Sequence, residues 1–174
     1  MAKQITTTVY TFDELSDKAK DKARDWYRDG ALDYEWWDST YEDAENVGLK
    51  LEYFGLDRNR HATGKFVEDA LSCAHKVMEE HGVECETYRT AELFLKKRGS
   101  IVDGWPKDED GEFENQGDLD EALDTCEAEY LKSILEDYSI ILQKEYEYLM
   151  SDEAVDEAIL ANEYTFTETG KREG

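Results

Sequence analysis

Residues 118–149 carry the pattern that most constrains the fold: apolar side chains recur on one helix face, and neither proline nor glycine interrupts them. The residues on this face are Leu119, Leu123, Tyr130, Leu131, Ile134, Tyr138, Ile141, Leu142 and Leu149. This periodicity predicts one long helix whose broad apolar face must be covered. Either the chain's own sheet or a second copy of the chain can cover it, so a homo-oligomer is one of two expectations.

Shorter patterns fill the rest of the chain. β-Branched and aromatic runs predict four strands, near residues 5–12, 49–56, 63–67 and 163–168. Helical spacing and cap residues predict further helices at 16–30, 33–46, 68–81, 86–98 and 151–162. The middle two strands are expected to form a β-hairpin. The order favours an α+β fold: a single domain over residues 1–174, in which several helices cover a small, mostly antiparallel sheet.

Residues 99–118 interrupt these patterns with four glycines, few apolar residues and Pro106, the one proline of the chain. They predict an acidic loop excursion. A calcium loop with Gly111 at its sixth position would place Pro106 and Gly117 at the first and last ligand positions. Neither residue supplies a carboxylate, so the pattern does not fit calcium.

Charge limits the possible partners. The chain has 44 acidic and 20 basic residues, a net charge of −24. Residues 101–174 hold 23 acidic and 5 basic residues, so most of the excess lies in this part. A field of this sign argues against nucleic acid and anionic membranes as partners, and it favours basic protein surfaces. The longest apolar runs are too short to span a bilayer.

The sequence contains no recognised motif for catalysis or metal binding. Nucleophile elbows, phosphate-binding glycine loops and zinc-protease motifs do not occur in the sequence. The cluster Cys73, His75, His81 and Cys85 lacks zinc-ligand spacing, and buried cysteines with surface histidines are expected there. The three cysteines show no CxxC pair and indicate free thiols in a reducing cytoplasm. The sequence therefore predicts a cytoplasmic protein that is not an enzyme and has no metal or cofactor.

A small basic island at the expected hairpin tip opposes the overall charge. Residues 55–65 contain three positive residues and one negative residue, and an aromatic pair lies shortly upstream. An exposed tryptophan beside arginine could stack a base, while an arginine holds a phosphate or carboxylate. Ion pairing of the arginines and packing of the tryptophans is the alternative. The predicted ligand- or partner-binding residues are Trp36, Trp37, Asp57, Arg58, Arg60, His61 and Lys65.

The segment Asp103–Glu129 is the most acidic part, with 12 acidic residues and one lysine. Carboxylates arranged along a continuous face could imitate DNA and block a basic nucleic-acid groove. A segment of this charge could instead aid solubility and speed the encounter with a basic partner protein. Both interpretations remain open from the sequence.

Three stretches resemble a known family: VYTFDELSDKAKDKARDWYR (9–28), WWDSTYEDAENVGLKLEYFGLDRNRHATGKF (36–66) and EDYSIILQKEYEYLMSDEAVDEAILANEYTFTETGK (136–171). The chain resembles small acidic phage and prophage proteins often labelled "antitoxin of toxin–antitoxin stability system". The resemblance implies a phage-encoded protein that neutralises a host toxin or immune system by binding. It would act in the bacterial host cytoplasm during infection, by sequestering a nucleotide-like immune signal or by docking on a basic protein surface. The alternatives are a DNA-mimic inhibitor of a nuclease, restriction or CRISPR complex, and an antitoxin of a toxin–antitoxin pair.

Overall fold

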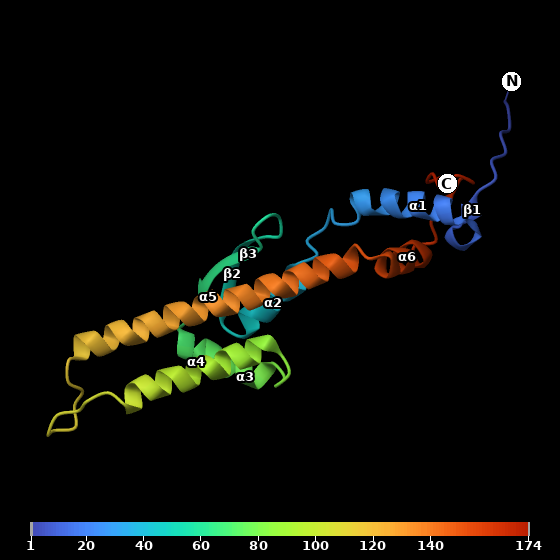
Figure 1. The fold of residues 1–174 in the computed structure, drawn as a ribbon. Helices are drawn as coiled ribbons and strands as arrows, with labels where there is room; N and C mark the ends of the chain where they lie inside the picture. The colour runs from blue at the N-terminus through green and yellow to red at the C-terminus, as the bar shows by residue number, and fades with distance from the viewer. Residues whose placement is uncertain (1, 174) are drawn as a thin grey trace. The chain divides into compact units, whose positions relative to one another are not determined.

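The computed structural model describes residues 2–173 and has the predicted α+β class (Figure 1). Where the sequence predicted one domain over residues 1–174, the chain divides into two compact units. Unit 1 comprises Met1–Trp36 and Lys144–Gly174, and unit 2 comprises Trp37–Gln143. The long helix α5 (Gln116–Leu149) contributes residues to both units. Within residues 2–173 no helix is both long and apolar enough to cross a membrane.

Unit 1 is built on two capped helices. Helix α1 (Asp17–Gly30) begins where Ser16 Oγ accepts the Ala19 N–H at 3.2 Å, and helix α6 (Asp152–Ala161) begins with the same bond from Ala154 to Ser151. A two-stranded antiparallel sheet, β1 (Tyr10–Thr11) with β4 (Thr165–Phe166), completes the unit. The core residues are Phe12, Leu15, Ala19, Ala23, Val155, Ile159 and Phe166.

The predicted single sheet is in fact two separate two-stranded sheets, and the strand expected at 5–12 is shorter. Thr11 ends it, because the Glu14 side chain accepts the Thr11 N–H at 2.8 Å and closes a 3-10 turn over Phe12–Glu14. The β-branched residues before Tyr10 lie outside any regular element. The partner strand β4 has only two residues and pairs with Tyr10 and Thr11, so residues 5–9 have no strand beside them in this sheet.

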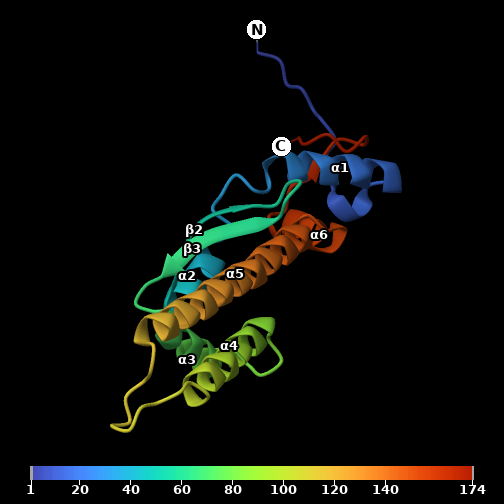
Figure 2. The ribbon, with the colours of Figure 1, turned by 60° about the vertical axis from the view of Figure 1, so that its left-hand side comes forward.

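Unit 2 packs a hairpin and three helices around the first part of α5. The elements are α2 (Asp38–Asn46), β2 (Leu49–Gly55), β3 (His61–Phe66), α3 (Ala70–Glu80) and α4 (Glu86–Asp103). The hairpin and the α3–α4 pair lie on different sides of α5 (Figure 2). The Tyr130 ring of α5 stacks on Phe66 of β3 at 5.6 Å and on Phe94 of α4 at 4.4 Å. The chain itself therefore covers much of the apolar face of α5.

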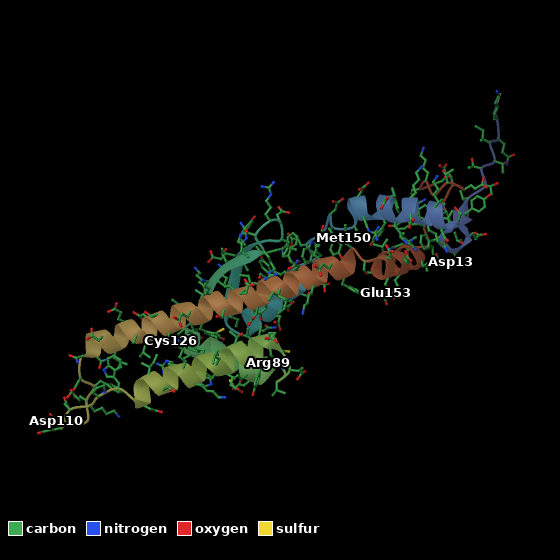
Figure 3. The ribbon with its side chains drawn as sticks, viewed as in Figure 1. Asp13, Arg89, Asp110, Cys126, Met150 and Glu153 are labelled. Atoms are coloured by element: carbon green, nitrogen blue, oxygen red, sulfur yellow. The ribbon has the colours of Figure 1, made fainter. Side chains whose placement is uncertain are left out.

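Some predicted boundaries shift. Helix α2 begins at Asp38 rather than near residue 33, and α4 runs to Asp103, so the acidic excursion narrows from 99–118 to residues 104–115. This segment is ordered by its own polar groups: Asp108 Oδ1 accepts the N–H groups of Asp110 and Glu112 at 2.9 and 3.0 Å. Asp110 lies at its tip (Figure 3).

Candidate functional site

The first candidate site is the tip of the β2–β3 hairpin. Gly55 pairs with His61, and the five residues between them form the turn. His61 Nδ1 lies 2.8 Å from the Asn59 carbonyl, so this nitrogen donates to it, and the imidazole lies 5.5 Å from the Tyr53 ring. These contacts hold the imidazole at the surface of the tip.

An open hollow of about 530 Å³ lies at this tip. The residues that line it are Tyr53, Gly55, Asp57, Arg58, Asn59 and His61. Three of the predicted site residues, Asp57, Arg58 and His61, are thus brought together, and all three are exposed. The hollow offers one guanidinium and one imidazole for an anionic group, beside the carboxylate of Asp57.

Arg60 does not line this hollow, although the sequence placed it in the site. Its Nε donates to Ser139 Oγ at 3.1 Å, its Nη1 donates to Gln143 Oε1 at 2.9 Å, and it forms an ion pair with Glu136. All three partners lie on α5. Arg60 therefore ties the hairpin to the long helix, and its guanidinium is already engaged.

Gly64 brings the hairpin and α5 close together. A Cβ atom there would lie 2.4 Å from the Lys50 carbonyl oxygen and 3.2 Å from Leu135 Cδ2 of α5. Only a residue without a side chain fits this contact. Lys65, the next residue and a predicted site residue, pairs across the strands with Lys50; both side chains are exposed, and neither lines the hollow.

Each of the two predicted tryptophans packs against another aromatic ring of its own unit. Trp37 packs edge-on against Phe54 of β2, with ring centroids 5.7 Å apart, inside unit 2. Trp36 belongs to unit 1 and packs against Tyr146 at 6.0 Å. Both indole side chains are half-buried. The packing alternative from the sequence therefore describes these two residues better than the exposed stacking site.

The second candidate site is the segment Asp103–Glu129, which joins the end of α4, the excursion and the start of α5. All of its carboxylate residues are exposed except Glu127, which is half-buried. In the described chain only Glu129 forms an ion pair, with Lys97 of α4. The remaining carboxylates have no cationic side chain within ion-pair distance, so their charge faces the solvent.

Sequence reasoning missed a polar network around His81, which it placed at the surface. His81 Nδ1 lies 2.6 Å from Thr87 Oγ1, and Nε2 lies 3.0 Å from Asp43 Oδ2. Tyr138 of α5 donates its hydroxyl to the same Asp43 oxygen at 2.7 Å. The hydrogen bond from His81, helped by that from Tyr138, lowers the pKa of the Asp43 carboxyl. The network spans 95 residues of sequence between Asp43 and Tyr138, so local patterns could not reveal it.

A hydroxyl, an imidazole and a carboxylate in this order are the groups of a catalytic triad. Here Thr87 is only 2% exposed, so its hydroxyl is shielded from any substrate. The network joins α2, the end of α3, the start of α4 and α5, which is a structural task. It stabilises unit 2 rather than offering a nucleophile.

Two of the three cysteines are shielded from substrates in the same way. Burial raises the pKa of the Cys73 thiol to about 11, and the Tyr130 hydroxyl lies 3.8 Å from its sulfur. Cys126 is buried as well, whereas Cys85, which was expected to be buried, is partly exposed. Over residues 2–173 no three His, Cys, Asp or Glu side chains lie together in a way that could hold a metal ion.

Comparison with known proteins identified no relative of this chain. No protein-family model, no curated protein and no solved structure matches this chain. The resemblance to phage antitoxin-like proteins therefore stays a prediction from the sequence. Function has to be argued from the geometry of the two candidate sites.

Proposed function

We propose that this protein neutralises a bacterial toxin or defence protein by docking on a basic surface of that protein. The docking surface is the segment Asp103–Glu129, and the setting is the host cytoplasm during phage infection. The observation that carries the proposal is that eleven of the segment's 12 carboxylates have no cationic partner among residues 2–173, the part of the chain that the structure describes. No catalytic step is part of this function.

Charge left without a partner in the fold is available to a partner outside it. Long-range attraction between such a surface and a basic protein raises association rates by about 10- to 1,000-fold at low salt. Docking would also relieve the mutual repulsion of the neighbouring carboxylates. The internal hydrogen bonds of Asp108 order residues 108–112, so this part of the surface is formed before docking.

The first turns of α5 favour one type of basic surface. Residues 118–129 carry six acidic residues, and at the rise of an α-helix they span about 17 Å. Averaged along the helix axis this is roughly one charge per 3 Å, against about 3.4 Å along a single DNA strand, and the side chains are spread around the side of the helix away from Leu119, Cys126 and Tyr130. A nucleic-acid-binding groove of a nuclease or restriction complex is therefore the second candidate partner, with the protein as a DNA mimic.

The alternative route, capture of a nucleotide-like signal at the hairpin tip, has less support. Arg60 is engaged by α5, which leaves Arg58 as the single guanidinium in the hollow. The net charge of −24 opposes the approach of an anionic ligand. One exposed arginine and one imidazole offer few contacts for a polyphosphate.

The test is rescue of bacteria that express single toxins or defence systems, followed by binding measurements on the purified target. The decisive variant replaces Asp118, Asp120, Glu121 and Asp124 with the corresponding amides. A matched control replaces four exposed glutamates of unit 2 with glutamine, at Glu42, Glu45, Glu79 and Glu80. Both variants change the net charge by the same amount.

We expect the first variant to lose rescue and to associate at least about tenfold more slowly, while the control retains both. The association rate of the parent should fall steeply with salt. Equal rescue by the two variants would contradict docking through this segment. If double-stranded DNA displaces this protein from its target, the protein acts as a DNA mimic. If DNA has no effect on the complex, the DNA-mimic function is excluded.

A further inference from the structure

A second hollow lies in unit 1, at the end of helix α1 and away from both candidate sites in sequence. Its volume is about 390 Å³. The residues that line it are Trp26, Tyr27, Asp29, Gly30 and Tyr164. Three of these five side chains are aromatic, and none is basic. Trp26 is 37% exposed, a large value for an indole that also contacts the core residue Phe166.

The Trp26 ring stands at a steep angle to each of the two tyrosine rings. Trp26 and Tyr164 are 5.2 Å apart with an interplanar angle of 85°, and Trp26 and Tyr27 are 6.5 Å apart at 60°. Rings arranged in this way present both faces and edges to the same space. Aromatic faces carry negative electrostatic potential, and such enclosures are a recurrent way to bind organic cations.

The helix end adds to this preference for positive charge. Gly30 is the last residue of α1, where backbone carbonyls carry the negative end of the helix dipole. The exposed Asp29 carboxylate lies in the same lining. Helix end, carboxylate and aromatic faces therefore all favour a cation, and no lining residue favours an anion.

The chain itself shows which cation these rings accept. The guanidinium of Arg172 lies 5.0 Å from the Tyr164 ring centroid and 5.9 Å from that of Trp26. Arg172 does not line the hollow, and its Nη1 donates to the Thr165 and Glu173 carbonyls. Two of the three rings thus already stack with one planar cation, while the hollow beside them stays open.

We infer that this hollow binds the guanidinium of an arginine side chain presented by a partner protein. The planar cation would lie against the Trp26 and Tyr27 rings and pair with the Asp29 carboxylate. The source of the arginine rests on the proposed docking function. Affinity for guanidinium itself does not, because it can be measured on this protein alone.

The test is titration of the full chain with N-acetyl-arginine methylamide, observed through the indole N–H resonance of Trp26 and, in every variant including the one that lacks this indole, through the backbone amide resonances of Asp29 and Gly30. The citrulline analogue is the matched control ligand, because it keeps the shape and removes the charge. Trp26→Leu removes the main wall, and Asp29→Asn removes the carboxylate without touching a ring. Asp17→Asn, at the exposed start of the same helix, is the matched control variant.

We expect saturable shifts at millimolar arginine ligand, and binding at least about tenfold weaker for citrulline. Asp29→Asn should weaken binding about threefold or more, Trp26→Leu should abolish it, and Asp17→Asn should leave it unchanged. Equal shifts from arginine and citrulline, or no effect of Asp29→Asn, would overturn the inference. Because the Asp29 side chain is exposed, its variant tests the pocket even where loss of Trp26 disturbs the fold. Failure here leaves the rescue test of the acidic segment unaffected.

Discussion

The helix pair α1–α6 and the segment Asp103–Glu129 are both rich in carboxylates, yet they use them in opposite ways. Between the two helices, Arg24 forms a two-pronged contact with Asp156, at 2.7 and 2.9 Å, and also pairs with Asp21. Arg28 pairs with Asp152 and donates to the Met150 carbonyl. In the acidic segment only Glu129 has such a partner among the residues that the structure describes.

The difference teaches that net charge is a poor guide to where a charge acts. Two arginines of α1 convert the carboxylates of Asp152 and Asp156 into cross-helix contacts, and there the negative charge holds the fold together. In the segment, Asp108 orders residues 108–112 through its hydrogen bonds, but most of the other carboxylates have no cationic partner among the described residues and repel one another. A surface of that kind is maintained at some cost in stability, which a role in binding would explain.

The largest effect that would sharpen this contrast is expected from Arg24→Ala. The substitution leaves Asp156 without its partner and removes the guanidinium from above the Phe12 ring, at 5.5 Å. Because the Arg24 and Asp156 side chains are only 17% and 28% exposed, we expect a loss of about 2 kcal/mol in the stability of unit 1. Amide hydrogen exchange of α1 and α6 measures it.

The matched control is Lys97→Ala, which breaks the Lys97–Glu129 pair of the acidic segment. Its side chains are 53% and 57% exposed, so the expected change in stability is within about 0.5 kcal/mol. A comparable loss of stability in Arg24→Ala and Lys97→Ala would show that the exposed ion pair of the acidic segment stabilises the fold as much as the half-buried ion pair of unit 1. The difference between the two regions would then not hold.

The hairpin allows a similar comparison between two nearby arginines: Arg58 is exposed, whereas Arg60 contacts α5. Arg60→Ala removes three contacts to α5 and should lower the stability of unit 2 by about 1 kcal/mol. Arg58→Ala should change it by less than about 0.5 kcal/mol, because Arg58 is exposed and forms no ion pair in the described chain. Urea unfolding monitored on unit 2 measures both changes.

Rescue assays give these two variants a second use. Docking through the acidic segment predicts that Arg58→Ala retains full neutralisation of the target. If the hairpin tip is instead the functional site, Arg58→Ala abolishes neutralisation while the fold survives. Loss of rescue in a stable Arg58 variant would therefore move the function from the acidic segment to the hairpin.

The sequence predicted the parts of this fold that depend on local physics. Ser16 and Ser151 cap helices as expected, and the apolar stripe of residues 118–149 forms one helix. Contacts between residues far apart in the sequence could not be predicted from local patterns. Arg60 was predicted to bind a ligand, because its partners Ser139 and Gln143 lie about 80 residues away along the chain. In the same way, the sequence showed which segment is acidic, but only the structure shows which carboxylates lack partners.

The smallest expected effect concerns pH and compares one carboxyl group from each unit. The hydrogen bond from Arg28 lowers the pKa of the Asp152 carboxyl below its ordinary value of 3.8. The ionised Asp152 therefore stabilises unit 1 above pH 3.8, and this stabilisation is lost only as the pH falls below that value. Burial raises the pKa of Asp137. The folded state therefore binds a proton at Asp137 more readily than the unfolded state, so the contribution of this one carboxyl group to the stability of unit 2 rises as pH falls from 7 toward 4.

Asp137→Asn isolates this group from the many other carboxylates that titrate in the same range. The amide oxygen can still accept the hydroxyl of Thr90, which donates to Asp137 in the parent. We expect the variant to be more stable than the parent at pH 7, with the difference shrinking toward pH 4, because only the parent has a buried charge to neutralise. Urea unfolding at pH 7 and 4.5 measures the two differences. A constant difference across this range would mean that Asp137 is as well solvated as the carboxylates of the acidic segment, and that burial does not separate them.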